Sequence, residues 1–290
     1  MKELVILSGK GGTGKTSITA SFAAISSEKV LCDADVDAAD LHLLLLPEIR
    51  QRTDFQGGGL AVIDPQKCSG CFTCVQACRF DAVKENFEID EIACEGCGVC
   101  VDFCPEQAIS FPVKTCGEWF VSDTRFGPMV HARMGVGQEN SGKLVALMRR
   151  EAEKLAKERN AGLLITDGPP GIGCPVIASV GGATAVLIVA EPTVSGMHDM
   201  ERVADLAGHF HVPVLVCVNK YDLNLDQAAA IEKTARGRNM TFVGRIPFDP
   251  AFIQSMVQGK TIIEYGGDLE ISRAVRRVWD NILASPVMNR

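Results

Sequence analysis

The chain has 290 residues, of which 47% are hydrophobic and 22% are charged, and its net charge of −7 excludes the basic footprint of a nucleic-acid-binding protein. Its longest apolar runs are too short to cross a bilayer, and its N-terminus lacks the long apolar region of a signal peptide. We therefore expect a cytoplasmic protein that is free of membrane. Because a reducing cytosol disfavours disulfides, the twelve cysteines indicate metal ligands or redox groups.

Short apolar runs alternate with helix-like stretches over most of the chain. The runs lack polar alternation, which is typical of strands covered by helices on both faces. Buried strands are expected at residues 4–7, 30–31, 163–165, 186–189 and 214–218, and helices at 17–27 and 143–159. The pattern predicts an α/β fold with a mostly parallel sheet flanked by helices, as in P-loop NTPases.

The first apolar run leads directly into a glycine-rich loop. Residues 9–16 satisfy the pattern G-x-x-x-x-G-K-[ST], between a strand and a helix as a phosphate-binding loop requires. The glycines let backbone N–H groups turn toward phosphates, and the helix N-terminus adds partial positive charge. We expect Lys15 to reach the β- and γ-phosphates of ATP, and the Thr16 hydroxyl to ligate Mg²⁺. The residues expected to bind the nucleotide here are Gly11, Gly12, Thr13, Gly14, Lys15, Thr16 and Ser17.

An additional lysine, Lys10, stands early in this loop. In this form the loop resembles the deviant Walker A sequence of the MinD, ParA and nitrogenase iron-protein superfamily. In that family the lysine reaches the phosphates of the other subunit, so the resemblance implies an ATP-dependent homodimer. The alternative is a solvated loop lysine with no such role.

The segment after the second strand also resembles this family. Asp33-Ala34-Asp35 stands at the position of its first switch. The resemblance implies that Asp35 orients the attacking water as a catalytic residue and that Asp33 supports the metal region. A strand-end turn would use the same residue types.

The α/β rhythm stops at three glycines, 57–59, and resumes after residue 113. Residues 64–113 contain three basic and nine acidic residues, a local net charge of −6, and carry a cysteine-rich internal repeat. We predict a discontinuous ATPase domain of residues 1–60 and 114–290. A small α+β ferredoxin-like domain is inserted at 61–113.

The repeat has the C-x₂-C-x₂-C-x₃-C spacing of bacterial ferredoxins, twice in tandem. Because the fourth cysteine of each run serves the other cluster, the spacing predicts two [4Fe-4S] sites. One is held by Cys68, Cys71, Cys74 and Cys104, and the other by Cys94, Cys97, Cys100 and Cys78. Zinc is the competing interpretation, but it uses four ligands in paired C-x-x-C units. The expected proline follows Cys104, whereas Arg79 follows Cys78, which predicts a difference in local exposure or potential.

Three later segments extend the family resemblance, which covers nearly all of the chain outside the insertion. Asp167 ends the third apolar run, where the resemblance implies a Walker B aspartate that holds Mg²⁺ through water. Asn219 resembles the adenine-contacting residue, and Pro247 and Asp249 belong to a segment that resembles the loop closing over the base. Ordinary strand-end turns remain the alternative for these last three.

The remaining features are expected to be structural. Cys32 and Cys217 lie in apolar strands, and Cys116 and Cys174 are also expected to pack, although a nucleotide-sensing role is open for Cys174. The stretch 271–283 sets apolar residues on one helical face and carries few basic residues, so we expect it to pack on the sheet rather than bind membrane.

The main functional interpretation is an ATPase whose dimer switch is coupled to electron transfer or metallocofactor maturation. The acidic insertion then favours a partner protein with a basic docking patch. The first alternative is a MinD/ParA-like positioning or scaffolding ATPase with redox-sensing clusters. The second alternative is an iron–sulfur cluster carrier.

Overall fold

The computed structural model describes residues 1–135 and 141–289 and divides into two compact units. The first unit comprises Met1–Arg52, Phe120–Ala132 and Ser141–Arg290. The second comprises Thr53–Trp119 and Arg133–Asn140.

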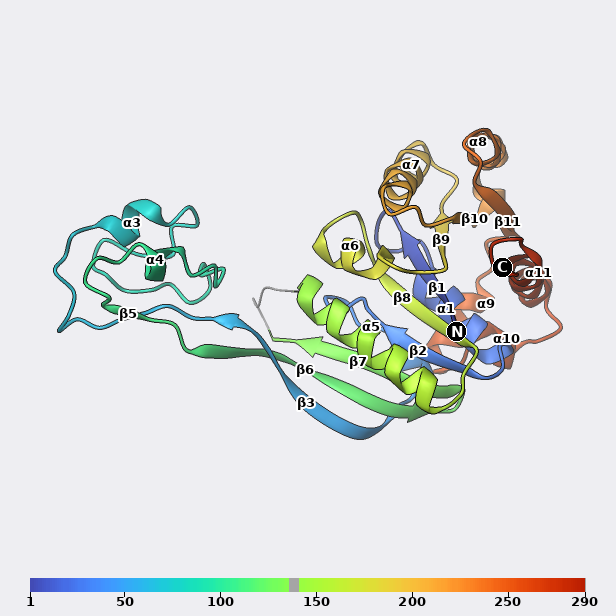
Figure 1. Ribbon diagram of the computed structural model, residues 1–290. Coiled ribbons are helices and arrows are strands. Elements are labelled where there is room, and N and C mark those ends of the chain that lie inside the picture. Colours follow the sequence, from blue (N-terminus) through green and yellow to red (C-terminus); the bar gives the residue numbers. More distant parts are fainter. Residues whose placement is uncertain (136–140, 290) are drawn as a thin grey trace. The chain divides into compact units, whose positions relative to one another are not determined.

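A nine-stranded sheet in the order β11-β10-β9-β1-β8-β2-β7-β6-β3 forms the centre of the first unit (Figure 1). The β1–β8, β1–β9, β2–β7, β2–β8, β9–β10 and β10–β11 pairs are all parallel, which confirms the predicted mostly parallel sheet. The strands are β1 (Lys2–Ser8), β2 (Lys29–Asp33), β3 (Glu48–Gly59), β6 (Val113–Thr124), β7 (Gly127–Met134), β8 (Leu163–Pro170), β9 (Ala185–Ala190), β10 (Val214–Asn219) and β11 (Thr241–Ile246).

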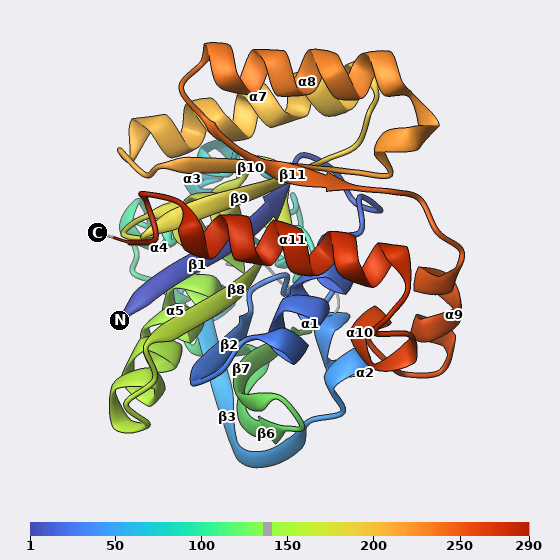
Figure 2. The same cartoon turned by 90° about the vertical axis from the view of Figure 1, so that its right-hand side faces the viewer.

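Helices cover both faces of this sheet, and consecutive side chains of one strand enter opposite cores. In β1, Leu4 and Ile6 belong to the core shared with α1 and α11, whereas Val5 and Leu7 belong to the core shared with α6, α7 and α8. Figure 2 shows α11 along one side of the sheet. The helices are α1 (Lys15–Ile25), α2 (Leu41–Leu45), α5 (Ser141–Glu158), α6 (Cys174–Val180), α7 (Val194–His209), α8 (Leu225–Gly237), α9 (Ala251–Val257), α10 (Ile262–Tyr265) and α11 (Glu270–Ala284), with a short 3₁₀ turn at Tyr221–Leu223.

All five apolar runs expected to be strands are strands, and both expected helices are present as α1 and α5. The sequence did not single out β3, β6, β7 or β11. In β3 most residues are exposed, so this strand has no continuous apolar run by which it could be recognised. The boundary between the two units falls within β3, β6 and β7, because these strands run from one unit into the other.

The C-terminal helix α11 packs on the first unit, as expected. Its apolar face, including Val275, Val278 and Trp279, is buried, and the Trp279 ring lies 4.9 Å from the ring of Phe22 in α1. In the part of the chain that the structure describes, no helix is both long enough and apolar enough to span a membrane.

The second unit contains little regular structure. It has a two-stranded antiparallel sheet of β4 (Val62–Ile63) and β5 (Ile109–Ser110), and two short helices, α3 (Thr73–Ala77) and α4 (Val99–Asp102). Its buried core consists of Ala61, Cys74, Val83 and Ile109. A core of this size offers little hydrophobic stabilisation.

Candidate functional site

The phosphate-binding loop leaves the carboxyl end of β1 and closes on the N-terminus of α1. Gly14 adopts a left-handed backbone with φ of 86°, and a Cβ placed there would come within 2.5 Å of Asn219 Nδ2. Only glycine meets both conditions without strain. The Asn219 amide donates a 2.8 Å hydrogen bond to the Thr13 carbonyl, so this side chain fixes the loop from β10.

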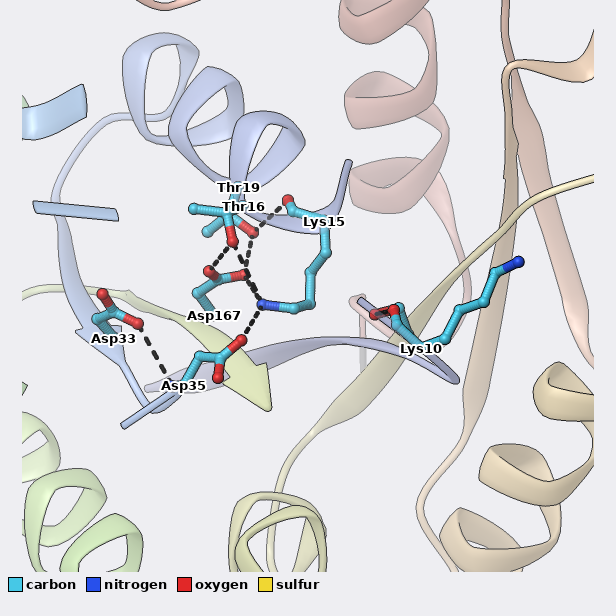
Figure 3. A network of polar contacts seen from close by, with 8 residues as sticks. Lys10, Lys15, Thr16, Thr19, Asp33, Asp35 and Asp167 are labelled. Atoms are coloured by element: carbon cyan, nitrogen blue, oxygen red, sulfur yellow. Dashed lines mark hydrogen bonds and ion pairs between the residues drawn. The ribbon is translucent and has the colours of Figure 1, made fainter. Parts of the chain in front are cut away.

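Lys15 lies at the centre of a buried polar network (Figure 3). Its ammonium group is 3.3 Å from Asp35 Oδ2 and 3.0 Å from Asp167 Oδ1. Asp167 also accepts hydrogen bonds from the hydroxyls of Thr16 at 2.7 Å and Thr19 at 2.8 Å. Side chains from the start of α1, the segment after β2, and β8 therefore meet at one point.

Sheet register brings these carboxylates together. Asp33 of β2 stands opposite Asp167 of β8, and both are fully buried. Burial raises the pKa of Asp33 well above its usual range, and repulsion from Asp167 adds to this. Burial also raises the pKa of Asp35, against the opposing pull of Lys15. The three carboxylates exceed the single ammonium in charge, which makes the site suited to a divalent cation.

The pKa of Lys15 is also raised, but for this side chain a raised pKa favours the charged form. Burial alone would lower its pKa, but the charges of Asp167 and Asp35 outweigh burial and raise it. Lys15 therefore remains a full positive charge inside the loop. Two buried oxygens near this network, Thr13 Oγ1 and Asp33 Oδ2, have no hydrogen-bond partner in the described residues. Such atoms are unfavourable unless a ligand, ion or water pairs with them.

Lys10 does not join this network. In Figure 3 its side chain points away from Lys15, and its ammonium group forms a 3.1 Å ion pair with Glu191. Glu191 also pairs with Lys220 at 2.6 Å, and Lys220 donates to the Gly12 carbonyl at 3.0 Å. The two lysines lower the pKa of Glu191, although its partial burial acts in the opposite direction.

A cavity of about 380 Å³ opens beside the loop. The polar end is formed by the loop, Asp35 and Asn219, and the other end by apolar residues of α9 and the preceding segment. That preceding segment is held by Asp222, whose Oδ1 accepts a 2.6 Å hydrogen bond from the Phe248 amide. The apolar lining consists of Pro247, Phe248, Phe252, Ile253 and Met256, with Asp249 at its edge.

Every residue predicted to bind the nucleotide is part of the lining of this cavity. Asp167 is connected to the cavity by the hydrogen bond that it accepts from the hydroxyl of Thr16. Lys10 alone of the predicted catalytic residues lies outside the Lys15 network in the described structure. The sequence interpretation missed Thr19, Glu191, Lys220 and Asp222. Thr19 lies one helical turn after Lys15, and Glu191 directly follows an apolar strand as Asp167 does, so helical spacing and strand-end position could have indicated both.

The eight repeat cysteines form two groups in the second unit. Each group lines its own cavity, and the groups coincide with the two predicted sets. Burial raises the pKa of Cys100 to about 11, and its charged neighbours are Cys94, Cys97 and Cys78. Burial likewise raises the pKa of Cys74, whose neighbours are Cys68 and Cys104. The crossed pairing, in which Cys78 and Cys104 join the opposite repeats, is thus present in the fold.

Within residues 1–135 and 141–289, no three His, Cys, Asp or Glu side chains converge closely enough to hold a single metal ion. In a cubane each thiolate binds a different iron at a different corner, so the sulfurs surround a space. Four cysteines line each of the two cavities, and thiolates are the donors that such a cluster binds.

All four of the other cysteines were expected to be buried, and three of them are. Cys32, Cys116 and Cys217 are buried, as predicted. Cys174 is exposed at the start of α6, so the expectation that it packs is wrong. It stands at the first position of a short surface helix, where its side chain faces solvent instead of the sheet.

Comparisons with known proteins agree with this geometry. The sequence model described as "CobQ/CobB/MinD/ParA nucleotide binding domain" matches residues 4–262. An uncharacterised protein of Methanocaldococcus jannaschii is 34% identical over 225 residues, covering 77% of this chain and 79% of that protein.

Two solved structures share the fold at low sequence identity. A chain of the MinC:MinD cell division protein complex of Aquifex aeolicus has a TM-score of 0.57 and 19% identity, covering 98% of this chain and 97% of that chain. The septum site-determining protein MinD of Pyrococcus horikoshii, complexed with Mg-ADP, has a TM-score of 0.60 and 14% identity, covering 97% and 95%.

Proposed function

Because the chain belongs to the CobQ/CobB/MinD/ParA nucleotide-binding family, we propose that it is a MinD/ParA-like switch driven by the binding and hydrolysis of Mg-ATP. The observation that carries this proposal is the position of Lys15, buried between Asp35 and Asp167 at the polar end of the 380 Å³ cavity. The neighbouring MinD structure that contains Mg-ADP supports the same ligand here.

The chain's own residues suggest how the site works. Phosphates bound by the loop amides attract the Lys15 ammonium, which then leaves the two carboxylates. Thr16 and Asp167 would hold a magnesium ion, which would neutralise negative charge on the transferred phosphoryl group. Asp35, released from Lys15, orients the attacking water. The unpartnered Asp33 and Thr13 oxygens support a site completed by ligands.

ATP-dependent dimerisation is the proposed output of this switch. Lys10 lies at the rim of the loop, with its side chain 40% exposed and paired with Glu191 rather than directed at its own Lys15 network. It is therefore available to a second subunit. Exchange of the Glu191 pair for a nucleotide phosphate would join the two protomers.

The test is ATP turnover and oligomeric state in two lysine variants. Lys15→Ala should abolish ATP binding and hydrolysis, whereas Lys10→Ala should still bind ATP but remain a monomer on a sizing column with ATP. The exposed Lys157→Ala in α5 is the matched control and should behave as the unmodified protein. Normal ATP-dependent dimers of Lys10→Ala would contradict the cross-subunit role.

We further propose that the second unit holds two [4Fe-4S] clusters, one in each four-cysteine cavity. Such clusters supply one-electron redox chemistry. Anaerobically purified protein should be brown and contain about eight irons per chain. Cys74→Ser and Cys100→Ser should each lose about half of this iron, while Cys174→Ser, at an exposed cysteine outside both sets, should lose none. A colourless protein without iron would contradict the proposal.

Two roles for the clusters remain to be separated. The family and fold comparisons favour a positioning or scaffolding ATPase, in which the clusters serve as a redox sensor. The crossed ligation and the acidic insertion favour electron delivery to, or metallocofactor maturation of, a basic partner. If ATP and ADP change the cluster potential or oxidation rate, nucleotide state and clusters are coupled. Equal behaviour in both nucleotides favours the scaffold.

A further inference from the structure

The two cysteine repeats are equivalent in spacing but differ in the residues between their ligands. Between its second and third cysteines the first repeat has Phe72-Thr73, whereas the second has Gly98-Val99. Both pairs line the cavity of their own repeat. The chain therefore surrounds two similar thiol sets with different side chains.

The difference that bears most directly on the sulfurs is hydrogen bonding. Thr73 Oγ1 lies 3.3 Å from Cys71 Sγ, a distance at which the hydroxyl can donate once the sulfur is a thiolate ligand. The Ala108 amide donates to Cys104 Sγ at 3.3 Å, so the first set has two such contacts. Val99, at the place of Thr73, has no hydroxyl. Among the described residues, no hydrogen bond joins a donor of another residue to the sulfurs of Cys78, Cys94, Cys97 or Cys100.

We propose that the two sites have unequal reduction potentials, with the higher potential at the set Cys68, Cys71, Cys74 and Cys104, and that Thr73 is a residue that sets this difference. Adding an electron increases the negative charge on the ligand sulfurs, and a hydrogen-bond donor stabilises that added charge. This inference rests on the proposed function, because it requires that both sites hold clusters.

Other groups near the sites do not reverse this order. Each cavity is lined by one carboxylate, Glu106 at the first and Glu95 at the second, so carboxylates do not distinguish them. Arg79 follows a ligand of the second set and favours its reduction, but its guanidinium is exposed and lies over Phe80 at 5.2 Å, where solvent screens its charge.

Phe72 partly covers the first set, and this cover acts to lower the reduction potential there, because exclusion of water disfavours added charge. Phe72 is itself 43% exposed, however, and Cys71 beside it is exposed. Water therefore still reaches the first set. A direct contact to a ligand sulfur outweighs this incomplete cover.

The experiment is a reductive titration followed by electron paramagnetic resonance on the full chain. The unmodified protein should show two potentials, and Thr73→Val should lower only the higher one. We expect a change of about threefold to tenfold in the reduction equilibrium constant, where tenfold corresponds to 59 mV for one electron. Thr73→Ser keeps the hydroxyl and should retain the original value. Val99→Ala, the matched change in the second repeat, should leave both values unchanged.

Three outcomes would overturn the inference. These are equal potentials in the unmodified protein, a Thr73→Val shift in the lower potential, and a shift in Thr73→Ser as large as that in Thr73→Val. Iron analysis of every sample separates this failure from that of the proposed function. Unmodified protein without iron refutes the clusters themselves, whereas a full iron content with any of the three outcomes refutes only the inference about the potentials and Thr73.

Discussion

At the scale of single residues, the nucleotide site is defined by how buried charges compensate one another. Lys15 and Asp35 are both buried, and each is tolerated because the other is near. Nucleotide phosphates offer Lys15 a stronger set of negative partners. The same ion pair can thus stabilise the free loop and release Asp35 when ATP binds.

Replacement of Asp35 by Asn tests this release. The amide keeps the size of the side chain but cannot act as a base, so we expect kcat for ATP hydrolysis to fall by about 10²- to 10⁴-fold while ATP binding is retained. Hydrolysis is measured by phosphate release and binding by calorimetry. Asp37→Asn, two residues later and exposed, is the control and should hydrolyse normally. Unchanged turnover in Asp35→Asn would remove Asp35 from the mechanism.

Asp222 provides a second test at this scale, because it holds the segment over the apolar end of the cavity through the Phe248 amide. Asp222→Ala should raise KM for ATP with little change in kcat. Loss of one such hydrogen bond costs about 1 kcal/mol, or roughly fivefold in affinity. Steady-state kinetics measure kcat and KM separately, with the substitution Asp226→Ala at an exposed position of α8 as control. A fall in kcat at constant KM would contradict a role for Asp222 in holding the segment over the apolar end of the cavity.

At the scale of elements, consecutive side chains of a strand, whether apolar or polar, point to opposite faces of the sheet. On β7, His131 is buried and its Nε2 lies 2.8 Å from Ser122 Oγ of β6. Burial lowers the pKa of His131 to about 4, with a smaller contribution from His42. The neutral ring is therefore the form that this part of the sheet accommodates.

This burial predicts that stability decreases with acidity. An unfolded histidine takes up a proton near pH 6.5, but folded His131 does so only near pH 4, so the unfolded state binds more protons between these values. Stability should be complete above about pH 6.5 and fall by up to about 3 kcal/mol toward pH 4. Denaturant unfolding across this range measures the slope. His131→Gln should have a shallower slope, whereas exposed His209→Gln should match the unmodified protein.

At the scale of the whole molecule, the two units differ in what stabilises them. The first has two extensive apolar cores on the faces of its sheet, whereas the core cluster around the cysteines of the second contains four buried apolar residues among those described. Removal of iron by an anaerobic chelator should therefore increase hydrogen exchange in the second unit, at peptides covering α3, α4 and β5. Peptides of β1 and β9 in the first unit should be unaffected. Equal protection of the second unit with and without iron would show that metal does not stabilise it.

The sequence alone determined much of the first unit and its site. Short continuous apolar runs such as that of β9 are typical of buried parallel strands, and the pattern G-x-x-x-x-G-K-[ST] between a strand and a helix indicates a phosphate-binding loop, so local pattern sufficed for both. The two cysteine sets could likewise be paired from spacing, because the repeat carries its own rule. By contrast, the exposed strand β3 and the exposure of Cys174 could not be predicted from local composition.

Only the tertiary structure decided which charges meet. The ion pairs of Lys10 and Lys220 with Glu191, and the hydrogen bond that the Phe248 amide donates to Asp222, join residues from separate strands and loops. The same is true of Asp33 and Asp167, which are 134 positions apart in the chain but opposite in register. The physical reason is that parallel strands with crossover connections bring distant segments to one sheet edge. Local pattern fixes where a strand ends, but only packing fixes which other strand ends beside it.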